Sequence, residues 1–352
     1  QGGNAPVFTN DSTYTINEGE TTIATMSATD ADGDTVTFNR TSDGDSSLFD
    51  INTSTGALSF TNAPDYETPG DSDTDNVYSV TVTATDGFNT TEQVISITVA
   101  NINDAAPAFS SSGSFTPNEN QTAIGTVVAS DADGDTVAYS LSGTDADSLE
   151  INSSTGVLTF KTAPDYETKS SYSAEAIASD GTNASAQTIS ITVVNVNEFT
   201  PTFTSASSFT VAENQTTGPT IAASDGDGDT LTYILTSIPS NGTMTDDGTL
   251  VTSDDLPKSS DGSNVVYTAT SETATSDSFT FKVNDSTLDS NESTATVNIT
   301  LVNDKPVATA QTVTATEQTA KEITLAGTDA EGDNLTYSIV DQPSNGNVTL
   351  DG

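Results

Sequence analysis

The chain has 352 residues and a formal charge of −44, from 51 acidic and 7 basic side chains, and it contains no His, Cys or Trp. This charge repels phosphate backbones and anionic lipid, so nucleic acid and bare membrane are excluded as favoured partners and cations are favoured. Without Cys and His the chain forms no disulfides and no thiolate or imidazole metal sites, and it lacks the usual general base of hydrolases. We therefore do not expect an enzyme.

The start of the chain reads QGGNAPVF, rather than a Met followed by a basic and apolar leader. We expect a mature product or an excised piece of a longer protein. No apolar run approaches the roughly 18 residues of a membrane span, so direct membrane insertion of this segment is not predicted. The many Ser and Thr residues with few Lys and Arg are typical of microbial surface proteins.

Alternation of apolar with Ser, Thr or Asn residues recurs along the chain, and helical spacing is nowhere sustained. Examples in chain order are VYSVTVTATDG, EQVISITVANIND, QTISITVVNVNE and STATVNITLVND, which begin at residues 77, 92, 187 and 293. A period of two predicts strands with one buried face, and many short strands between turns predict antiparallel sandwiches of about 100 residues. The predicted core of the first sandwich contains Tyr14, Ile16, Val80, Val82, Ile95, Ile97 and Val99.

The segments NINDAAPAF, NVNEFTPTF and LVNDKPVAT each close a strand, and Pro107, Pro201 and Pro306 then open the next module. These short linkers predict a stiff string of domains over residues 1–104, 105–198, 199–304 and 305–352. Modules one and two share one set of motifs, whereas PSNGTMTDDG and PSNGNVTLDG relate the third to the last. About 48 residues do not complete a sandwich of this size, so we expect the natural protein to continue.

An acidic turn also repeats: DADGD at residues 30–34 returns as DADGD at 131, DGDGD at 225 and DAEGD at 329. Carboxylates two residues apart can be aimed at one point, and Ca²⁺ takes six to eight oxygen ligands. An EF-hand is excluded because Gly33 lies fourth and Thr41 twelfth from Asp30, where that loop requires Gly at six and Glu at twelve. The alternative is a plain Asp-Gly turn between strands.

Other acidic groups keep a fixed phase with this turn. The first module has Glu18 in NEGE, Asp65 and Glu67 in PDYE, Asp86 in ATDG, and Asn101, Asn103 and Asp104 in NIND; the second has Glu119, Asp165, Glu167, Asp180, Asn195, Asn197 and Glu198 in the same motifs. This set resembles the cadherin-type repeat, specifically the microbial cadherin-like (dystroglycan-type) kind, over nearly the whole chain. The resemblance implies an all-β linear rod of tandem immunoglobulin-like, antiparallel Greek-key β-sandwich domains.

The resemblance also implies calcium between successive repeats. Its expected ligands at the first junction are Glu18, Asp65, Glu67, Asn101, Asn103, Asp104, Asp131, Asp133, Asp180 and the Ile102 carbonyl. At the second junction they are Glu119, Asp165, Glu167, Asn195, Asn197, Glu198, Asp225, Asp227, Asp285 and the Val196 carbonyl. At the third they are Glu213, Asn303, Asp304, Asp329 and Glu331, and Asp30, Asp32 and Asp86 would face a module upstream.

The linkers depart from the family pattern Asp-x-Asn-Asp-Asn. Asn101 and Asn195 stand at its first position, and Ala105 and Phe199 at its last, so each junction loses charge and one carbonyl ligand. The third module has no DYE segment, and only Asp254 and Asp255 stand at a comparable place. We expect fewer ions at the third junction.

The expected function is non-enzymatic: a calcium-stiffened extracellular or cell-surface rod of an adhesin, surface layer or filament. Its partners would be calcium, other copies of itself, or surface and matrix proteins or glycans. The alternative is a spacer or glycan-binding module of a secreted polysaccharide-degrading enzyme. Most of the 9 Tyr and 13 Phe fall at core positions, however, and few are left for a sugar platform.

Two features of the composition, the glycosylation sequons and the excess of acidic residues, support further interpretations. About fourteen Asn-x-Ser/Thr sequons, from Asn10, Asn39, Asn52 and Asn89 onward, exceed chance and suggest a glycoprotein. The acid excess also fits salt adaptation, because halophile proteins carry solvated acidic faces without specific sites. Of the 51 acids, 36 are Asp, many of them in the phased motifs, which favours calcium ligation over salt adaptation alone.

Overall fold

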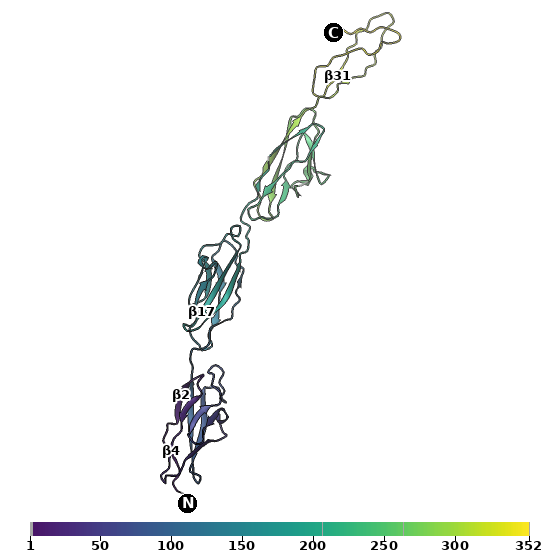
Figure 1. Cartoon of the computed structure of the whole chain (residues 1–352). Coiled ribbons are helices and arrows are strands. Elements are labelled where there is room, and N and C mark those ends of the chain that lie inside the picture. Colours follow the sequence, from purple (N-terminus) through teal and green to yellow (C-terminus); the bar gives the residue numbers. More distant parts are fainter. Residues whose placement is uncertain (1–2, 206, 263, 352) are drawn as a thin grey trace. The chain divides into compact units, whose positions relative to one another are not determined.

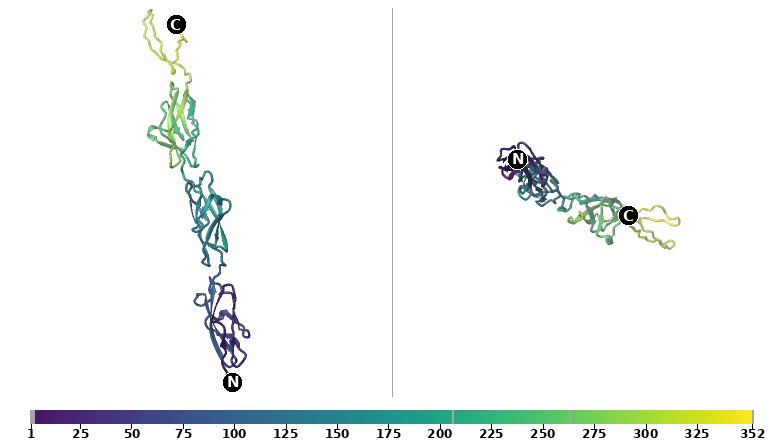
Figure 2. Two further views of the ribbon diagram at one scale, coloured as in Figure 1. Left: turned by 90° about the vertical axis from the view of Figure 1, so that its left-hand side faces the viewer. Right: turned by 90° about the horizontal axis from the view of Figure 1, so that it is seen from below.

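The computed structural model describes residues 3–205, 207–262 and 264–351. The chain separates into two compact units, residues 1–194 and residues 195–352. Strands dominate both, and the only helices in the described residues are three short 3₁₀ turns (Figure 1). The β-rich modules can be followed in two further views (Figure 2). The prediction of an all-β chain of sandwich modules is confirmed.

The first module packs a four-stranded sheet, in the order β2-β9-β8-β5, against a three-stranded sheet, β3-β7-β6, with β1 paired to β4. The strands are β1 Val7–Phe8, β2 Thr13–Asn17, β3 Thr22–Thr25, β4 Ala28–Thr29, β5 Thr37–Arg40, β6 Phe49–Ile51, β7 Ala57–Phe60, β8 Val77–Thr85 and β9 Thr90–Ala100; η1 spans Ser46–Leu48. The alternation expected of β8 and β9 is confirmed, because Val80, Val82, Ile95 and Ile97 are almost completely buried. Ile16 and Val99 join this core, and Tyr14 packs against it half-buried.

One pairing differs from the antiparallel pattern. Strand β2 runs parallel to β9, with Thr13 opposite Ser96 and Asn17 opposite Ala100. The first long strand and the last one therefore point the same way, so the chain enters the module at one end and leaves it at the other. This arrangement is repeated by β11 (Ser114–Phe115) with β18 (Ala184–Thr192) and by β20 (Ser208–Ala212) with β29 (Ser293–Thr300). It places the acidic turn at the entry end of a module and the buried glutamate, the PDYE segment and the linker at the exit end.

The second module repeats the first, with sheets β11-β18-β17-β14 and β12-β16-β15 and the pair β10-β13. Its elements are β10 Ala108–Phe109, β11 Ser114–Phe115, β12 Ala123–Thr126, β13 Ala129–Ser130, β14 Ala138–Ser142, η2 Ala146–Ser148, β15 Leu149–Ile151, β16 Val157–Phe160, β17 Ser171–Ser179 and β18 Ala184–Thr192. Leu158, Ala176, Ile189 and Ile191 fill its core. Phe109 packs against this core, as its position after the linker proline predicts.

The third module, in the second unit, has larger sheets: β20-β29-β28-β23-β26 and β21-β27-β24-β25, with the pair β19-β22. Its elements are β19 Thr202–Phe203, β20 Ser208–Ala212, β21 Thr216–Thr217, β22 Ala223–Ser224, β23 Thr232–Leu235, β24 Gly242–Asp246, β25 Thr249–Leu250, η3 Ser253–Asp255, β26 Lys258–Ser260, β27 Val265–Ala269, β28 Ser276–Asn284 and β29 Ser293–Thr300. Tyr267, Phe279 and Val297 are fully buried in its core. The extra hairpin and edge strand distinguish this module from the first two.

The last stretch forms a single described strand pair, β30 Val307–Ala308 with β31 Gly327–Thr328, the latter labelled in Figure 1. Its apolar side chains are largely exposed, and Val340 keeps 89% of its surface accessible. No core cluster is found among its described residues, in contrast to the three modules before it.

Candidate metal centre

The acidic turn has the same hydrogen bonds in each of the first three modules. Oδ1 of its first Asp accepts the backbone N–H two residues on, at 2.8 Å from Asp30 to Asp32 and 3.0 Å from Asp131 to Asp133. The Gly that follows adopts a left-handed φ, 84° at Gly134, which a residue with a Cβ rarely adopts. Oδ2 of Asp30 and of Asp131 is buried and finds no hydrogen-bond partner in the described residues. The hydrogen bonds of the turn therefore account for Oδ1 of each carboxylate and leave Oδ2 without a role in the turn.

The second acid of the turn holds the linker. Oδ2 of Asp133 accepts the backbone N–H groups of Asp104, at 3.2 Å, and Ala105, at 3.0 Å. The Asn101 amide donates to the Asp133 carbonyl at 2.9 Å. Oδ1 of Asp133 is buried, and no donor in the described part of the chain reaches it. Asp133 thus lies where two modules meet and keeps one carboxylate oxygen available.

At the exit end of the first module, a buried glutamate also accepts a hydrogen bond from a backbone N–H group of the linker. Glu18 is 4% exposed. Its Oε1 accepts the N–H of Ile102 at 2.9 Å, and its Oε2 accepts the N–H of Tyr66 at 2.7 Å. The carboxylate therefore fixes the start of the linker and the PDYE segment at once. Ile102 was predicted through its carbonyl, and that role stays a prediction.

Four of the predicted ligands converge at the first junction. Glu18, Glu67, Asp104 and Asp133 each place a carboxylate oxygen within 4.8 Å of the others. No base among the described residues forms an ion pair with any of them. Desolvation, with the charges of Glu18 and Asp133, raises the pKa of Glu67 to about 7. Desolvation and the same two charges also raise the pKa of Asp104. The cluster is short of positive charge.

The remaining first-junction residues flank this cluster. Asp65 uses Oδ1 to accept the N–H groups of Glu67 and Thr68, both at 3.0 Å. Oδ1 of Asp180 accepts the N–H groups of Thr182 and Asn183, each at 2.6 Å. Desolvation by burial raises the pKa of Asp180, but these two bonds together with side-chain hydrogen bonds from Asn103 and Asn183 outweigh it, so the pKa is lowered. Oδ1 of Asn103 accepts a hydrogen bond from the Asn183 side-chain amide at 2.8 Å, which ties the linker to the Asp180 turn.

The third junction has its own cluster, inside the second unit. Glu213, Glu272, Asp304 and Glu331 place carboxylate oxygens within 4.8 Å of one another. Glu213 is 3% exposed, and its Oε1 accepts the N–H of Val302 at 2.8 Å, as Glu18 does with Ile102. The Asp304 N–H donates to Oε2 of Glu331 at 3.0 Å. One oxygen on each of Glu213, Glu272 and Glu331 is buried without a partner in the described residues.

Glu272 is not among the predicted ligands, because Asp254 and Asp255 are the acids that stand in sequence at the place of the DYE segment. Asp255 instead accepts the N–H and the hydroxyl of Thr252, both at 2.7 Å, and caps η3. Glu272 lies three residues beyond β27, the strand that pairs with β21. In the first module, Asp65 and Glu67 likewise follow β7, the partner of β3. Glu272 could therefore have been found only from the strand order, as an acid that follows the strand equivalent to β7, because no local sequence motif marks it.

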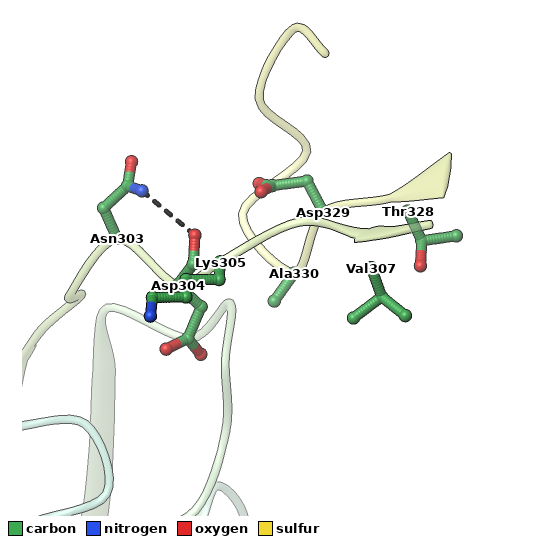
Figure 3. Close-up of a pocket in the computed structure, with 7 residues that line it drawn as sticks. All are labelled: Asn303, Asp304, Lys305, Val307, Thr328, Asp329 and Ala330. Carbon is green, nitrogen blue, oxygen red and sulfur yellow. Dashed lines mark hydrogen bonds between the residues drawn. The ribbon is translucent and has the colours of Figure 1, made fainter. Parts of the chain in front are cut away.

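A hollow beside this cluster contains two more predicted residues, Asn303 and Asp329 (Figure 3). The Asn303 amide donates to the Asp304 carbonyl at 3.1 Å. Oδ1 of Asp329 accepts the N–H of Asp333, four residues on, at 2.9 Å; the corresponding bond in the first turn, from Asp34 to Asp30, is 3.3 Å. Lys305 also lines the hollow, and its charge opposes cation binding there. The expectation of fewer ions at the third junction stays a prediction.

Comparison with known families divides the chain in two. Residues 12–100 and 112–197 match the cadherin domain model, and residues 197–300 and 303–352 match a bacterial Ig domain model. This is a cadherin-like tandem-repeat protein. The two matches meet at residue 197, close to the predicted end of the second module.

Relatives of this cadherin-like protein include protocadherin Fat 4 of Homo sapiens, 32% identical over 199 residues that cover 52% of this chain and 4% of Fat 4. Protocadherin gamma-A10 of Pan troglodytes is 30% identical over 242 residues, which cover 62% of this chain and 25% of the relative. Integrin beta-like protein E of Dictyostelium discoideum is 28% identical over 210 residues, which cover 54% of this chain and 11% of the relative. The chain thus spans only a small part of these relatives.

Solved structures agree on the fold of the cadherin-like chain. The protocadherin gamma B4 extracellular domain has a TM-score of 0.61 at 20% identity, covering 93% of this chain and 56% of that one. Mouse cadherin-23 EC22-24 has a TM-score of 0.57 at 23% identity, covering 82% and 96%. No helix in the described residues has the length and apolar character to cross a membrane.

The expected ligands of the second junction are divided between the two units of the cadherin-like chain, because the second unit begins at Asn195. In the first unit, the N–H of Tyr166 donates to Oε2 of Glu119 at 2.7 Å, and Asp165 accepts the N–H of Thr168 at 3.1 Å. Glu167 lies between Tyr166 and Thr168 in sequence, at the position that corresponds to Glu67. This half repeats the exit end of the first module.

The half in the second unit repeats the entry end. Oδ2 of Asp227 accepts the N–H groups of Glu198, at 3.0 Å, and Phe199, at 2.8 Å. The Asn195 amide donates to the Asp227 carbonyl at 3.0 Å. Oδ1 of Asp227 and Oδ2 of Asp225 are buried, and they have no partner within the described ranges. The Asn197 amide donates to Oδ2 of Asp229 at 2.8 Å, which ties the linker to the acidic turn 32 residues further along the chain. The Val196 carbonyl stays a predicted ligand.

The turn at Asp285 matches the Asp180 turn. Its Oδ1 accepts the N–H groups of Thr287 and Leu288 at 2.8 and 2.7 Å. Asp86 forms the same turn in the first module, where its Oδ1 accepts the N–H groups of Phe88 and Asn89 at 2.7 and 2.6 Å. Oδ2 of Asp32 accepts the N–H of Asn4 at 2.5 Å. Asp86 differs in that the Asn89 amide also donates to its second oxygen, at 3.2 Å.

Proposed function

We propose that this protein is a non-enzymatic, extracellular calcium-binding rod, whose cadherin-like modules are stiffened by calcium at their junctions. It would act by spacing and by contact, as part of an adhesin, surface layer or filament. The predicted modules are residues 1–104, 105–198, 199–304 and the start of a fourth at 305–352. The observation that carries the proposal is the convergence of Glu18, Glu67, Asp104 and Asp133 across the first junction.

The donor chemistry of this junction fits calcium. All the donors are oxygens from carboxylates, side-chain amides and the backbone, which a hard cation of variable coordination prefers. Asp131 and Asp133 each hold one buried carboxylate oxygen without a partner in the described residues, although a buried polar atom is normally satisfied. The rest of the proposed set is Glu18, Asp65, Glu67, Asn101, Asn103, Asp104, Asp180 and the Ile102 carbonyl. When bound, the ion would supply the positive charge that this set lacks.

Charge explains why occupancy would control stiffness. Two unit charges 4 Å apart repel by about 1 to 4 kcal/mol between bulk water and a near-surface dielectric. Four carboxylates therefore push the linker and the two module ends apart when no cation is present. A calcium ion reverses the sign of the interaction and links residues of both modules.

Salt adaptation is the competing explanation of the acid excess, and ion exchange distinguishes the two. We expect the melting temperature of the chain in EDTA to rise when calcium is added in excess of the EDTA, because free calcium at about 100 times Kd stabilises by about 2.7 kcal/mol. Potassium chloride at the same ionic strength should have little effect. If potassium and calcium raise the melting temperature equally, the acids act as a solvated face.

Proton competition gives a second prediction. A calcium ion at the first junction must displace the proton of Glu67, whose ion-free pKa is raised to about 7 by desolvation and by its acidic neighbours. Calcium affinity should therefore fall as the pH is lowered from 8 to 6. Calorimetric titrations at both pH values, with Glu67→Gln as the comparison, measure this. A dependence that persists unchanged in Glu67→Gln would contradict the assignment.

A glycan platform is less well supported, because the large aromatic side chains lie mostly in or against the module cores. Phe88, 75% exposed on the Asp86 turn, is the clearest exception. Binding to an array of polysaccharides that Phe88→Ala abolishes would favour the spacer or carbohydrate-binding alternative. Calcium-dependent self-association would favour the adhesin or filament.

A further inference from the structure

The first module carries a loop insertion that the second lacks. Nine residues separate Thr68 from Tyr78, whereas three separate Thr168 from Tyr172. The two Tyr positions correspond, because Ser79 donates its N–H to Oδ2 of Asp45 at 3.0 Å, and Ser173 does the same to Asp145 at 2.7 Å. The added residues include the sequence DSDTD, with three acids at alternate positions.

The second module neutralises this place with a lysine. Lys169 forms an ion pair with Oδ1 of Asp145. This contact, with the hydrogen bond from Ser173, lowers the pKa of Asp145. In the first module Oδ1 of Asp45 accepts the Ser72 N–H at 3.2 Å instead, and no lysine or arginine of the described residues pairs with it. The insertion therefore adds three acids where the second module has a cation.

The three inserted acids converge, and one of them is buried. Asp71, Asp73 and Asp75 bring carboxylate oxygens within 4.8 Å of one another. Asp71 is 5% exposed, and its Oδ2 accepts the N–H of Asp75 at 2.8 Å. Its Oδ1 is buried and has no hydrogen-bond partner in the described part of this module. Burial of an ionised carboxylate is costly unless a donor or a cation compensates it.

Two neighbours strengthen the case for a ligand. Asp73 brings a carboxylate oxygen within 4.8 Å of those of Asp71 and Asp75. Asn76 is 8% exposed and donates its amide N–H to the Tyr66 carbonyl at 2.9 Å. The amide oxygen of Asn76 is also buried without a partner in the described residues. Clustered carboxylates and two unsatisfied buried oxygens within six residues require a positive charge or a donor.

We propose that the loop Asp71–Asn76 binds one calcium ion in the first module, at a carboxylate cluster distinct from the four junction carboxylates Glu18, Glu67, Asp104 and Asp133. Asp71 supplies the buried ligand, and Asp73 and Asp75, which are exposed, supply the outer ligands and leave room for water. Oxygen-only donors in an adaptable loop suit Ca²⁺ better than the octahedral Mg²⁺ ion. The ion takes the place that the Lys169 charge has in the second module and holds the inserted loop against Asp45.

The full chain tests this proposal by equilibrium dialysis with radioactive calcium and by hydrogen exchange measured on peptides of residues 68–78. Asp73→Asn/Asp75→Asn is the variant of choice, because both side chains are exposed and an asparagine in place of Asp75 can still accept the Val77 N–H, which Asp75 accepts at 2.8 Å. We expect it to bind one calcium fewer per chain. Calcium should slow exchange in this loop at least tenfold in the unchanged chain and not in the variant.

Two comparison variants complete the design. Asp11→Asn/Glu92→Gln removes the same charge from exposed positions of the first module and should keep the bound calcium and the loop protection. Asp133→Asn weakens the proposed junction site and should leave the loop protection intact, so failure of one site is distinguishable from failure of the other. An unchanged calcium count in Asp73→Asn/Asp75→Asn, or loop exchange that calcium does not alter, would overturn the proposal.

Discussion

Asp133→Asn is expected to lower the calcium affinity of the first junction at least tenfold while leaving the calcium-free protein as stable as before, or more stable. An Asn side chain keeps one oxygen to accept the N–H groups of Asp104 and Ala105. It removes one of four clustered charges, however. Loss of a charged ligand worth about 1.4 kcal/mol or more corresponds to the tenfold change, and relief of repulsion favours the ion-free state.

Calcium titration by calorimetry and urea unfolding in EDTA measure the two parts of this prediction. Asp147→Asn is the matched control, since Asp147 is an exposed acid of the same module on the short turn η2. The control should change neither quantity. Equal calcium affinity in Asp133→Asn and in the unchanged chain would remove Asp133 from the site.

Glu18→Ala is expected to destabilise the first module by about 1 to 3 kcal/mol even in EDTA, because two part-buried backbone N–H groups lose their acceptor. Those groups belong to Tyr66 and Ile102, at 2.7 and 2.9 Å from the carboxylate. The loss should add to a weaker response to calcium. Glu18 thus has a structural role beneath its proposed role as a ligand.

Urea unfolding in EDTA, followed by tyrosine fluorescence, measures the structural part. Glu20→Ala serves as the control, because Glu20 lies two residues away and is exposed. If Glu18→Ala and Glu20→Ala unfold at the same urea concentration, the two hydrogen bonds contribute nothing to stability.

The fold was predictable in strands where apolar and polar residues alternate, because such alternation identifies the buried face. Val80, Val82, Ile95 and Ile97 were assigned to the core from period-two spacing, and all four are buried. The parallel pairing of β2 with β9 was not predictable in this way, because alternation identifies faces and says nothing of strand direction. Direction is set by where the chain must leave the module, which depends on the number of strands in each sheet.

The candidate site was predictable where acids recur in phase with a local motif. Glu18, Glu67, Asp104 and Asp133 were all expected at one junction, and their carboxylates converge. Glu272 was not, because its place in the third cluster follows from the pairing of β27 with β21. The insertion carrying Asp71 was likewise invisible to a search for repeats, since it occurs in one module alone.

Small-angle X-ray scattering of the full chain tests the central claim, that calcium at the junctions determines stiffness. In 1 mM CaCl2 we expect the maximum dimension of an extended rod, and in EDTA a smaller radius of gyration with the smeared profile of hinged modules. Returning calcium in excess should restore the first profile. Scattering curves that superimpose in calcium and in EDTA, at matched ionic strength, would contradict the claim.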